Sequence, residues 1–486
     1  MSFYLGIDLG TSSVKLLLIG EDQRIIGSSH AALDVQRPHP GWSEQDPASW
    51  ITATEAAMAE LKAAHPAQMA SVTGIGLSGH MHGATLVNQS GNVLRPCILW
   101  NDTRSFAEAA ELDTQSIFRA LTGNIVFPGF TAPKVLWVAR HEPRIFAQIS
   151  KVLLPKDYLR LWLTGEYVSE MSDAAGTSWL DVGKRKWDGA LLSSTGLDAS
   201  HMPSLVEGTH VSGYLRNDLA ARWGMTGKVA VAGGAGDNAA SACGMGTVAP
   251  GSAFVSLGTS GVLFASNDAY RPNPSSAVHA FCHAIPDTWH QMGVILSATD
   301  SLNWLANISG RDPASLTSGL GETLQRPGPV MFLPYLSGER TPHNDASVRG
   351  SFTGLGHESG VDAMAKAVLE GVAYAVRDCL EALNAAGTVL TRVTAIGGGS
   401  RSVYWLKVIA AALNIPVDIP AEGDFGAAFG AARLGLIAAT GADPLAICAP
   451  PATARTIEPD PALVPAFAEG HARYRKLYPA IQGALT

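Results

Sequence analysis

One seven-residue segment occurs twice in the chain in nearly the same form. Residues 8–14 read Asp-Leu-Gly-Thr-Ser-Ser-Val, and residues 256–262 read Ser-Leu-Gly-Thr-Ser-Gly-Val, so five of the seven positions match. Each copy lies between two short apolar runs, which is the pattern of two strands joined by a tight turn. The copies are roughly half a chain apart, and a repeat of this kind predicts two related domains.

Strand-like and helix-like runs alternate along the rest of the sequence. Strands are expected at residues 3–9, 14–19, 25–28, 72–77, 84–87, 152–154, 228–232, 253–257, 330–333 and 393–396, with helices at 48–64, 362–383, 427–439 and 466–485. This alternation predicts an α/β fold whose strands are covered by helices. Gly, Pro and Thr interrupt the pattern near residues 244–250, so we expect domains at 1–245 and 246–486; residues 450–465 resemble a linker.

Composition excludes several classes of protein. Of 486 residues, 47% are hydrophobic and 16% are charged, which excludes a disordered chain. The formal net charge of −8 argues against a nucleic-acid partner. The five cysteines are widely spaced and no secretory signal precedes residue 8, so we expect buried free thiols in a cytoplasmic protein. The uncharged stretch 238–267 contains Gly and Pro and is not expected to span a membrane.

The two repeated turns have the chemistry of phosphate sites. Turns of this kind present backbone N–H groups and hydroxyls, which bind phosphate oxygens, and glycine allows close approach of the backbone. A single such turn would be no more than a tight hairpin, but two in matching positions predict a polyphosphate held between the domains. The residues are Gly10, Thr11 and Ser12 in the first turn and Gly258, Thr259 and Ser260 in the second.

The repeat is asymmetric at its first position, where Asp8 corresponds to Ser256. A carboxylate facing a phosphate would repel it unless a divalent cation lay between them. Asp8 is therefore a candidate Mg²⁺ ligand together with nucleotide phosphates. The alternative is an aspartate that caps its own turn at the end of a strand.

A second candidate carboxylate follows the predicted strand 228–232. There Gly233-Gly234-Ala235-Gly236-Asp237-Asn238 opens an Ala-rich helix, which places Asp237 at or near the helix N-terminus. A carboxylate fixed beside a Gly-rich turn could accept the proton of a hydroxyl that attacks a phosphoryl group. An ordinary N-cap explains the same pattern equally well.

A triple glycine, Gly397-Gly398-Gly399, follows the predicted strand 393–396. Its flat backbone could accept an adenine or ribose face, although a flexible turn is the alternative. Residues 423–432 then place small side chains along a helix, which permits close packing against a neighbouring helix or a ligand.

His80-Met81-His82 follows the predicted strand 72–77. An extended His-x-His segment would put both rings on one face and could bind a metal, but no third ligand lies nearby in sequence. Hydrogen bonding of His82 to a substrate, with Met81 packed on a carbon skeleton, is the favoured interpretation. Trp100 and Asn101 could add an aromatic wall and a polar group to the same half, or could simply end a buried strand.

Taken together, these motifs resemble those of the FGGY carbohydrate kinases, which belong to the actin-like, ribonuclease H-like ATPases. The resemblance extends from Gly6 to about Arg433. Residues 6–12 and 257–261 look like the two phosphate motifs of the family. Residues 129–137 and 351–370 look like its two signatures, although Ala363 stands where a polar residue is usual.

The resemblance implies a function and a role for each motif. Segments 41–47, 79–84, 98–104 and 336–343 are similar to those of family members that phosphorylate D-xylulose. It implies that Met81 and His82 contact a ketose, that Asn238 assists at the sugar, and that Asp237 is the general base. Mg-ATP would then phosphorylate the C5 hydroxyl of D-xylulose, with Asp8 positioning the metal. The two turns and the triple glycine would hold ATP.

Other outcomes stay open at this level. Another ketopentose or a polyol could be the substrate, and a non-sugar actin-like ATPase module is a further alternative. A homodimer is expected from the family alone.

Overall fold

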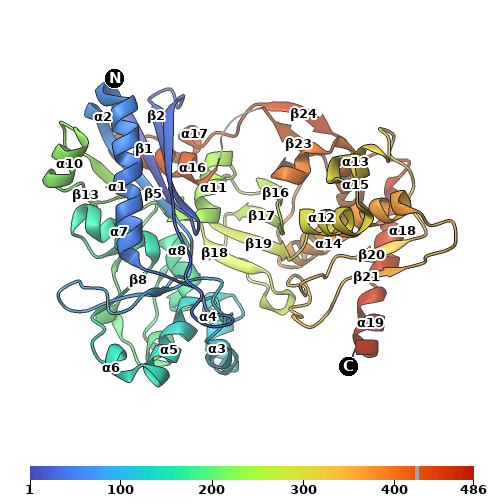
Figure 1. Ribbon diagram of the computed structural model, residues 1–486, viewed down its shortest axis with the longest axis horizontal. Coiled ribbons are helices and arrows are strands. Elements are labelled where there is room, and N and C mark those ends of the chain that lie inside the picture. The colour runs from blue at the N-terminus through green and yellow to red at the C-terminus, as the bar shows by residue number, and fades with distance from the viewer. Residues whose placement is uncertain (422–425, 486) are drawn as a thin grey trace.

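The computed structural model describes residues 1–421 and 426–485 as two lobes, each built on a mixed β-sheet (Figure 1). In the first sheet, β1 (Phe3–Leu9) pairs antiparallel with β2 (Ser13–Gly20), which pairs with β3 (Ile25–Ala32). On its other side β1 pairs in parallel with β5 (Val72–Gly79). The sheet continues through β14 (Ala230–Ala232) to β13 (Val211–Tyr214).

The second sheet repeats this arrangement. Its central hairpin is β16 (Ala253–Leu257) with β17 (Gly261–Asn267), followed by β19 (Trp289–Ile295) and the edge strand β18 (His279–Cys282). On its other side β16 pairs in parallel with β22 (Val393–Ile396), and β22 with β23 (Val417–Pro420). The repeated segment therefore occupies the same hairpin in both sheets, which confirms the duplicated α/β architecture.

Helices and short strands complete the two lobes. The first lobe contains helices α1 (Pro47–Ala64), α2 (Pro66–Ala70), α3 (Phe106–Asp113), α4 (Ser116–Thr122), α5 (Thr131–His141), α6 (Pro143–Phe146), α7 (Pro155–Thr164), α8 (Met171–Ala174), α9 (Gly189–Ser193), α10 (Asn217–Trp223) and α11 (Asp237–Met245). Its short strands are β4 (Glu44–Gln45), β6 (Thr85–Val87), β7 (Cys97–Ile98), β8 (Lys151–Leu153), β9 (Val168–Glu170), β10 (Leu180–Asp181), β11 (Lys186–Trp187), β12 (Ser204–Val206) and β15 (Ala235–Gly236). The second half adds α12 (Thr299–Ser309), α13 (Pro313–Ser318), β20 (Met331–Leu333), β21 (Ser351–Thr353), α14 (Val361–Ala385), α15 (Val403–Leu413), α16 (Ala427–Thr440) and α17 (Pro444–Ile447).

The first sheet is covered by helices from both halves of the chain. Leu5, Ile7 and Leu9 of β1 pack in one apolar core with residues of α1. On the opposite face, α16 lies so close that a Cβ placed on Gly76 of β5 would lie 1.8 Å from the carbonyl oxygen of Ala431. The small side chains of α16 thus allow backbone-to-backbone packing. Of the predicted small-residue segment, residues 423–425 lie outside the described part of the chain.

The C-terminal region differs from the sequence prediction in two ways. The expected linker contains β24 (Thr453–Ile457), which pairs with β23 at the edge of the second sheet. The single helix expected at 466–485 is wrong, because α18 (Val464–Tyr474) and α19 (Leu477–Leu485) are separate. A continuous helix would require an N–H that Pro479 lacks and would press its ring on the carbonyl of Arg475.

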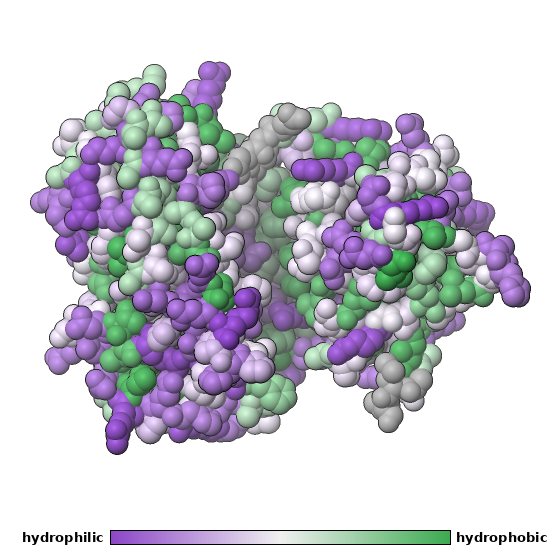
Figure 2. Space-filling model, viewed as in Figure 1, coloured by the Kyte–Doolittle hydropathy of each residue, from purple (hydrophilic) through white to green (hydrophobic). Residues whose placement is uncertain are grey.

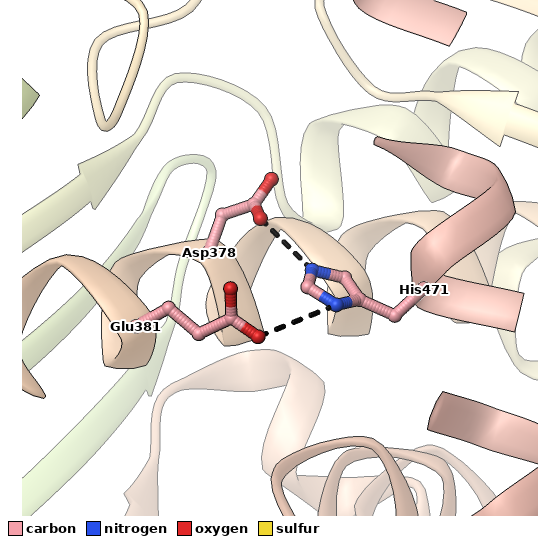
Figure 3. Close-up of side chains that lie close together, drawn as sticks. All are labelled: Asp378, Glu381 and His471. Carbon is pink, nitrogen blue, oxygen red and sulfur yellow. Dashed lines mark hydrogen bonds and ion pairs between the residues drawn. The ribbon is translucent and has the colours of Figure 1, made fainter. Parts of the chain in front are cut away.

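Helix α18 is fixed to α14 by a buried histidine (Figure 3). The Nε2 atom of His471 lies 2.8 Å from Asp378 Oδ1, and its Nδ1 lies 3.5 Å from Glu381 Oε1. The guanidinium of Arg475 lies 2.8 Å from Glu381 Oε2, and Arg377 lies 3.2 Å from Glu381 Oε1. Both oxygens of Glu381 already have cationic partners, so we interpret the cluster as an ion-pair network between the two helices.

The remaining predictions from composition concern cysteines and membranes. All five cysteines lie in the described residues, where they are buried free thiols. Within the described chain, no helix is long and apolar enough to cross a membrane. The uncharged stretch 238–267 instead forms most of α11 and the β16–β17 hairpin.

Candidate active site

The first of the two predicted phosphate turns lies between β1 and β2 and is held by side chains from outside the hairpin. The indole N–H of Trp100 donates to Thr11 Oγ1 at 3.0 Å, and the Gln45 amide donates to the Thr11 carbonyl at 2.7 Å. Ser12 is exposed at the tip of the turn. The surface is hollowed between the two lobes (Figure 2).

The second turn is anchored to the start of α12. The carbonyl of Gly258 accepts from the Thr299 N–H at 2.9 Å and from the Thr299 hydroxyl at 2.8 Å. The carbonyl of Thr259 accepts from the Ala298 N–H at 2.7 Å. These bonds hold the turn through its carbonyl oxygens, while the Thr259 and Ser260 side chains are exposed.

Asp237 is the first residue of α11, as the sequence predicts. Its Oδ1 atom accepts from the backbone N–H of Asn238 at 2.7 Å and from the Asn238 side-chain amide at 2.9 Å. Burial, reinforced by the charge of Asp8, raises the pKa of Asp237 to about 6. Two carboxylates that are far apart in sequence are thus brought within electrostatic reach of each other.

Met81 and His82 lie beside the turn that precedes Asp237. A Cβ on Gly236 would lie 2.8 Å from Met81 Cγ, and Met81 is buried. His82 Nδ1 lies 2.7 Å from the carbonyl oxygen of Gly176, and its ring stacks on Phe130 with centroids 4.5 Å apart. Burial lowers the pKa of His82 to about 3, so the ring is neutral at physiological pH. A carbonyl can only accept, so Nδ1 carries the proton and Nε2 is left as an acceptor.

The backbone at His82 is held by a buried lysine. The Nζ atom of Lys134 donates to the carbonyl oxygens of His82, at 2.9 Å, and Gly129, at 2.6 Å. Burial lowers the pKa of Lys134 to about 7, and a neutral amine can still donate both hydrogen bonds. Lys134 therefore holds the backbone of the loop that carries His82, which we call the His82 loop (residues 80–84), against the start of α5.

His80 does not share a face with His82. His82 has a φ of 70°, so the backbone is left-handed at this residue and not extended, as a metal-binding His-x-His segment would require. The His80 ring packs edge-on against Trp50, with centroids 5.8 Å apart. Burial lowers the pKa of His80 to about 3, and the two rings have different surroundings.

The segment after β7 divides into exposed and structural residues. Trp100 is 48% exposed, and Asn101 is also exposed, so both can reach a ligand. Asp102 and Arg104 form a buried ion pair, with Oδ2 and Nη2 2.6 Å apart, and Arg104 lies 3.6 Å above the Trp42 ring. The buried Asp102–Arg104 ion pair therefore has a structural role in the loop after β7.

The triple glycine separates two cavities: one lies between α11 of the first lobe and the second lobe, and the other lies within the second lobe. One, of about 450 Å³, is lined by residues that include Ser241, Met245 and Gly397. The other, of about 460 Å³, is lined by residues that include Asn303, Gly398 and Trp405. A side chain at Gly398 would meet nothing within 4 Å, so the backbone here is open to a flat ligand.

Several residues of the site carried no signal in the sequence. Gly176 holds His82, yet it lies in no recognisable motif. Met245 and Asn303 line the cavities from helices that are distant in sequence. Phe130 and Lys134 lie within residues 129–137, which resemble a family signature, and that resemblance is the sequence signal that points to the His82 loop.

Two duplicated sheets with paired hairpin turns, and a pair of carboxylates beside them, define the class of actin-like ATPase folds. Within that class, the sequence models of the FGGY family of carbohydrate kinases match residues 3–244 (N-terminal domain) and 253–439 (C-terminal domain). The chain belongs to this family, and it is a carbohydrate kinase with ATP as co-substrate.

Individual relatives agree with this assignment. The xylulose kinase of Escherichia coli K12 is 50% identical over 438 residues, which cover 90% of each chain. The crystal structure of a "xyloylose kinase" from Brucella ovis has a TM-score of 0.98 and 68% identity and covers 99% of this chain and 100% of that one. The xylulose kinase structure from Rhodospirillum rubrum has a TM-score of 0.93 and 28% identity and covers 99% of each chain.

Proposed function

We propose that this kinase transfers the γ-phosphoryl group of ATP to the C5 hydroxyl of D-xylulose. The observation that carries the proposal is the close contact of Gly236, the residue before Asp237, with Met81, which precedes His82, together with the electrostatic effect of Asp8 on Asp237. The similarity to xylulose kinases of E. coli and B. ovis supports the choice of sugar.

In this mechanism Asp237 is the general base. With a pKa of about 6 it is mostly ionised at neutral pH, yet it is basic enough to take the proton of the attacking hydroxyl. Its hydrogen bonds from Asn238 hold the carboxylate in one orientation. The transfer needs little covalent help, so positioning and charge stabilisation supply most of the rate enhancement.

The sugar would be oriented by the His82 loop. The neutral ring can accept a hydrogen bond from a sugar hydroxyl at Nε2, while Met81 offers an apolar contact for the carbon chain. Asn238, Trp100 and Asn101 would complete the sugar site.

ATP would lie between the lobes, with its phosphates on the two hairpin turns and its adenosine against Gly397–Gly399. The site also fits Mg²⁺, because the carboxylate of Asp8 provides an oxygen ligand of the kind that this ion prefers and lies within electrostatic reach of Asp237. When bound, the ion neutralises charge that develops on the phosphates. Asp8 would hold it.

The test is ADP release, coupled to a reporter enzyme, across a panel of pentuloses, hexuloses and polyols with Mg-ATP. We expect D-xylulose to give the highest kcat/KM, and Asp237→Ala to lose turnover while ATP still binds. A higher kcat/KM for another sugar would replace the substrate. ADP release that no sugar stimulates would support a non-sugar ATPase instead.

Three further expectations rest on family resemblance and composition: a division into units at residues 1–245 and 246–486, a cytoplasmic location and a homodimer. Light scattering of the purified protein measures the last of these directly.

A further inference from the structure

Five charged side chains are buried together behind the turn that carries Asp237. Lys156 Nζ lies 2.9 Å from Asp157 Oδ1, 3.2 Å from Glu170 Oε1 and 2.9 Å from Asp173 Oδ2, and Arg160 Nη2 lies 3.7 Å from Asp157 Oδ1. All five side chains are fully buried. Burial raises the pKa of Asp173 well above its usual range, against the opposing effect of the nearby Lys156 cation.

Desolvating five ionisable groups is costly, and an apolar core of the same volume would often be at least as stable. The contacts of the cluster indicate what it does instead. Arg160 donates to the carbonyl oxygens of Ala232, at 2.6 Å, and Gly233, at 2.5 Å. Both carbonyls belong to the chain that leads into Asp237.

A second connection runs through Ser172, in α8. Its Oγ accepts from the backbone N–H of Gly236 at 3.1 Å and donates to Glu170 Oε2 at 2.8 Å. Glu170 also accepts from the backbone N–H groups of Ser172 and Asp173, at 2.7 and 2.9 Å. The residue before Asp237 is therefore bonded to a helix start that Lys156 holds in place.

The same segment also touches the His82 loop. Gly176 lies one helical turn after Ser172, in the 3₁₀-helix η1 (Ala175–Thr177), and its carbonyl accepts from His82 Nδ1 at 2.7 Å. A Cβ on Gly176 would lie 2.6 Å from the His82 ring and 2.9 Å from Met81 Cε. Only glycine fits there without moving both side chains.

We propose that Ser172 and Gly176 are positioning residues that set the distance between the general base and the sugar. Ser172 orients Asp237 through Gly236, and Gly176 orients His82, from one helical segment anchored on Lys156. The inference rests on the proposed function, and it adds a segment, residues 170–177, that no motif had identified.

Two substitutions test the inference, because one is expected to change kcat and the other the KM for the sugar. Ser172→Ala is expected to lower kcat about 10- to 100-fold, because the turn before Asp237 loses its anchor, with both KM values within about threefold of wild type. Ser172→Thr, which keeps the hydroxyl, should recover most of kcat. Gly176→Ala is expected to raise the KM for the sugar about tenfold or more and to leave the KM for ATP unchanged.

Ser169→Ala is the matched control. It removes a buried hydroxyl bonded to Asp157 Oδ2 at 2.6 Å, in the same cluster but not in contact with Asp237 or His82. We expect a melting temperature close to that of Ser172→Ala with wild-type kcat and KM. Should Ser172→Ala fail to fold, Ser172→Cys keeps the volume with a weaker acceptor and should give an intermediate kcat.

Three results would overturn the inference: wild-type kcat in Ser172→Ala, equal loss of kcat in Ser169→Ala, or a KM for ATP that rises as much as that for the sugar in Gly176→Ala. The wild-type panel keeps the two proposals apart. If the wild-type enzyme prefers another sugar, D-xylulose is refuted as the substrate, and the kinetics of the variants are then compared with that other sugar. No sugar-dependent turnover at all refutes both.

Discussion

Lowering the pH from 7 to 5 should protonate Asp237 and reduce phosphoryl transfer about tenfold. With a pKa of about 6, the carboxyl is about 90% ionised at pH 7 and about 10% ionised at pH 5. Only the ionised form can accept the proton of the sugar hydroxyl. The acid limb of the rate profile should therefore follow this one group.

A substitution can separate the two causes of the raised pKa of Asp237. Burial is the largest cause and the charge of Asp8 the next, while the hydrogen bonds from Asn238 oppose both, so Asp8→Asn should lower the pKa of Asp237. An infrared titration of carboxyl groups without nucleotide, with Asp237→Asn as the difference control, measures it directly. Titration near pH 4, or no response to Asp8→Asn, would refute the reasoning.

The same shift has a consequence for stability. The folded-state pKa lies above the unfolded value of 3.8, so the folded state binds the proton more tightly, and stability falls as pH rises through about 4 to 6. At pH 7 the ionised carboxyl costs about 3 kcal/mol. Asp237→Asn should then resist urea better than wild type at pH 7 and by a smaller margin at pH 4.5. Equal gains at both pH values would contradict this.

Three other substitutions test separate parts of the molecule. Lys156→Met leaves three buried carboxyl groups without their shared cation and should destabilise the fold by about 3–5 kcal/mol, seen as a lower urea midpoint. Gly398→Val points into open space, so we expect an unchanged melting temperature but a KM for ATP raised about tenfold or more; an unchanged KM would remove adenosine from this turn. Trp100→Phe removes the exposed hydrogen bond to Thr11 and should change stability by less than about 0.5 kcal/mol, while kcat/KM for the sugar falls.

Sequence reasoning was most successful where local patterns decide the structure. The expected strand 3–9 is present as β1 because it is a short apolar run that ends at a turn containing glycine, and the expected helix 362–383 is present as α14 because its apolar residues repeat with helical spacing. It failed at the C-terminus, where Pro479 divides one helical pattern into α18 and α19. At His80-Met81-His82, the metal site that an extended segment would permit was already disfavoured from the sequence, and the left-handed backbone of His82 departs from that extended geometry.

By itself, the sequence determined the duplicated hairpins, the α/β class and the identity of the polar residues that could do chemistry. Each of these follows from the spacing of residues that are close together in the sequence. Only the tertiary structure decided which of them meet. Asp8 and Asp237 come together because β1 and α11 converge at one end of a sheet, and Gly176 reaches His82 across a gap of 94 residues. Contacts of that kind depend on packing between distant elements, so no local pattern encodes them.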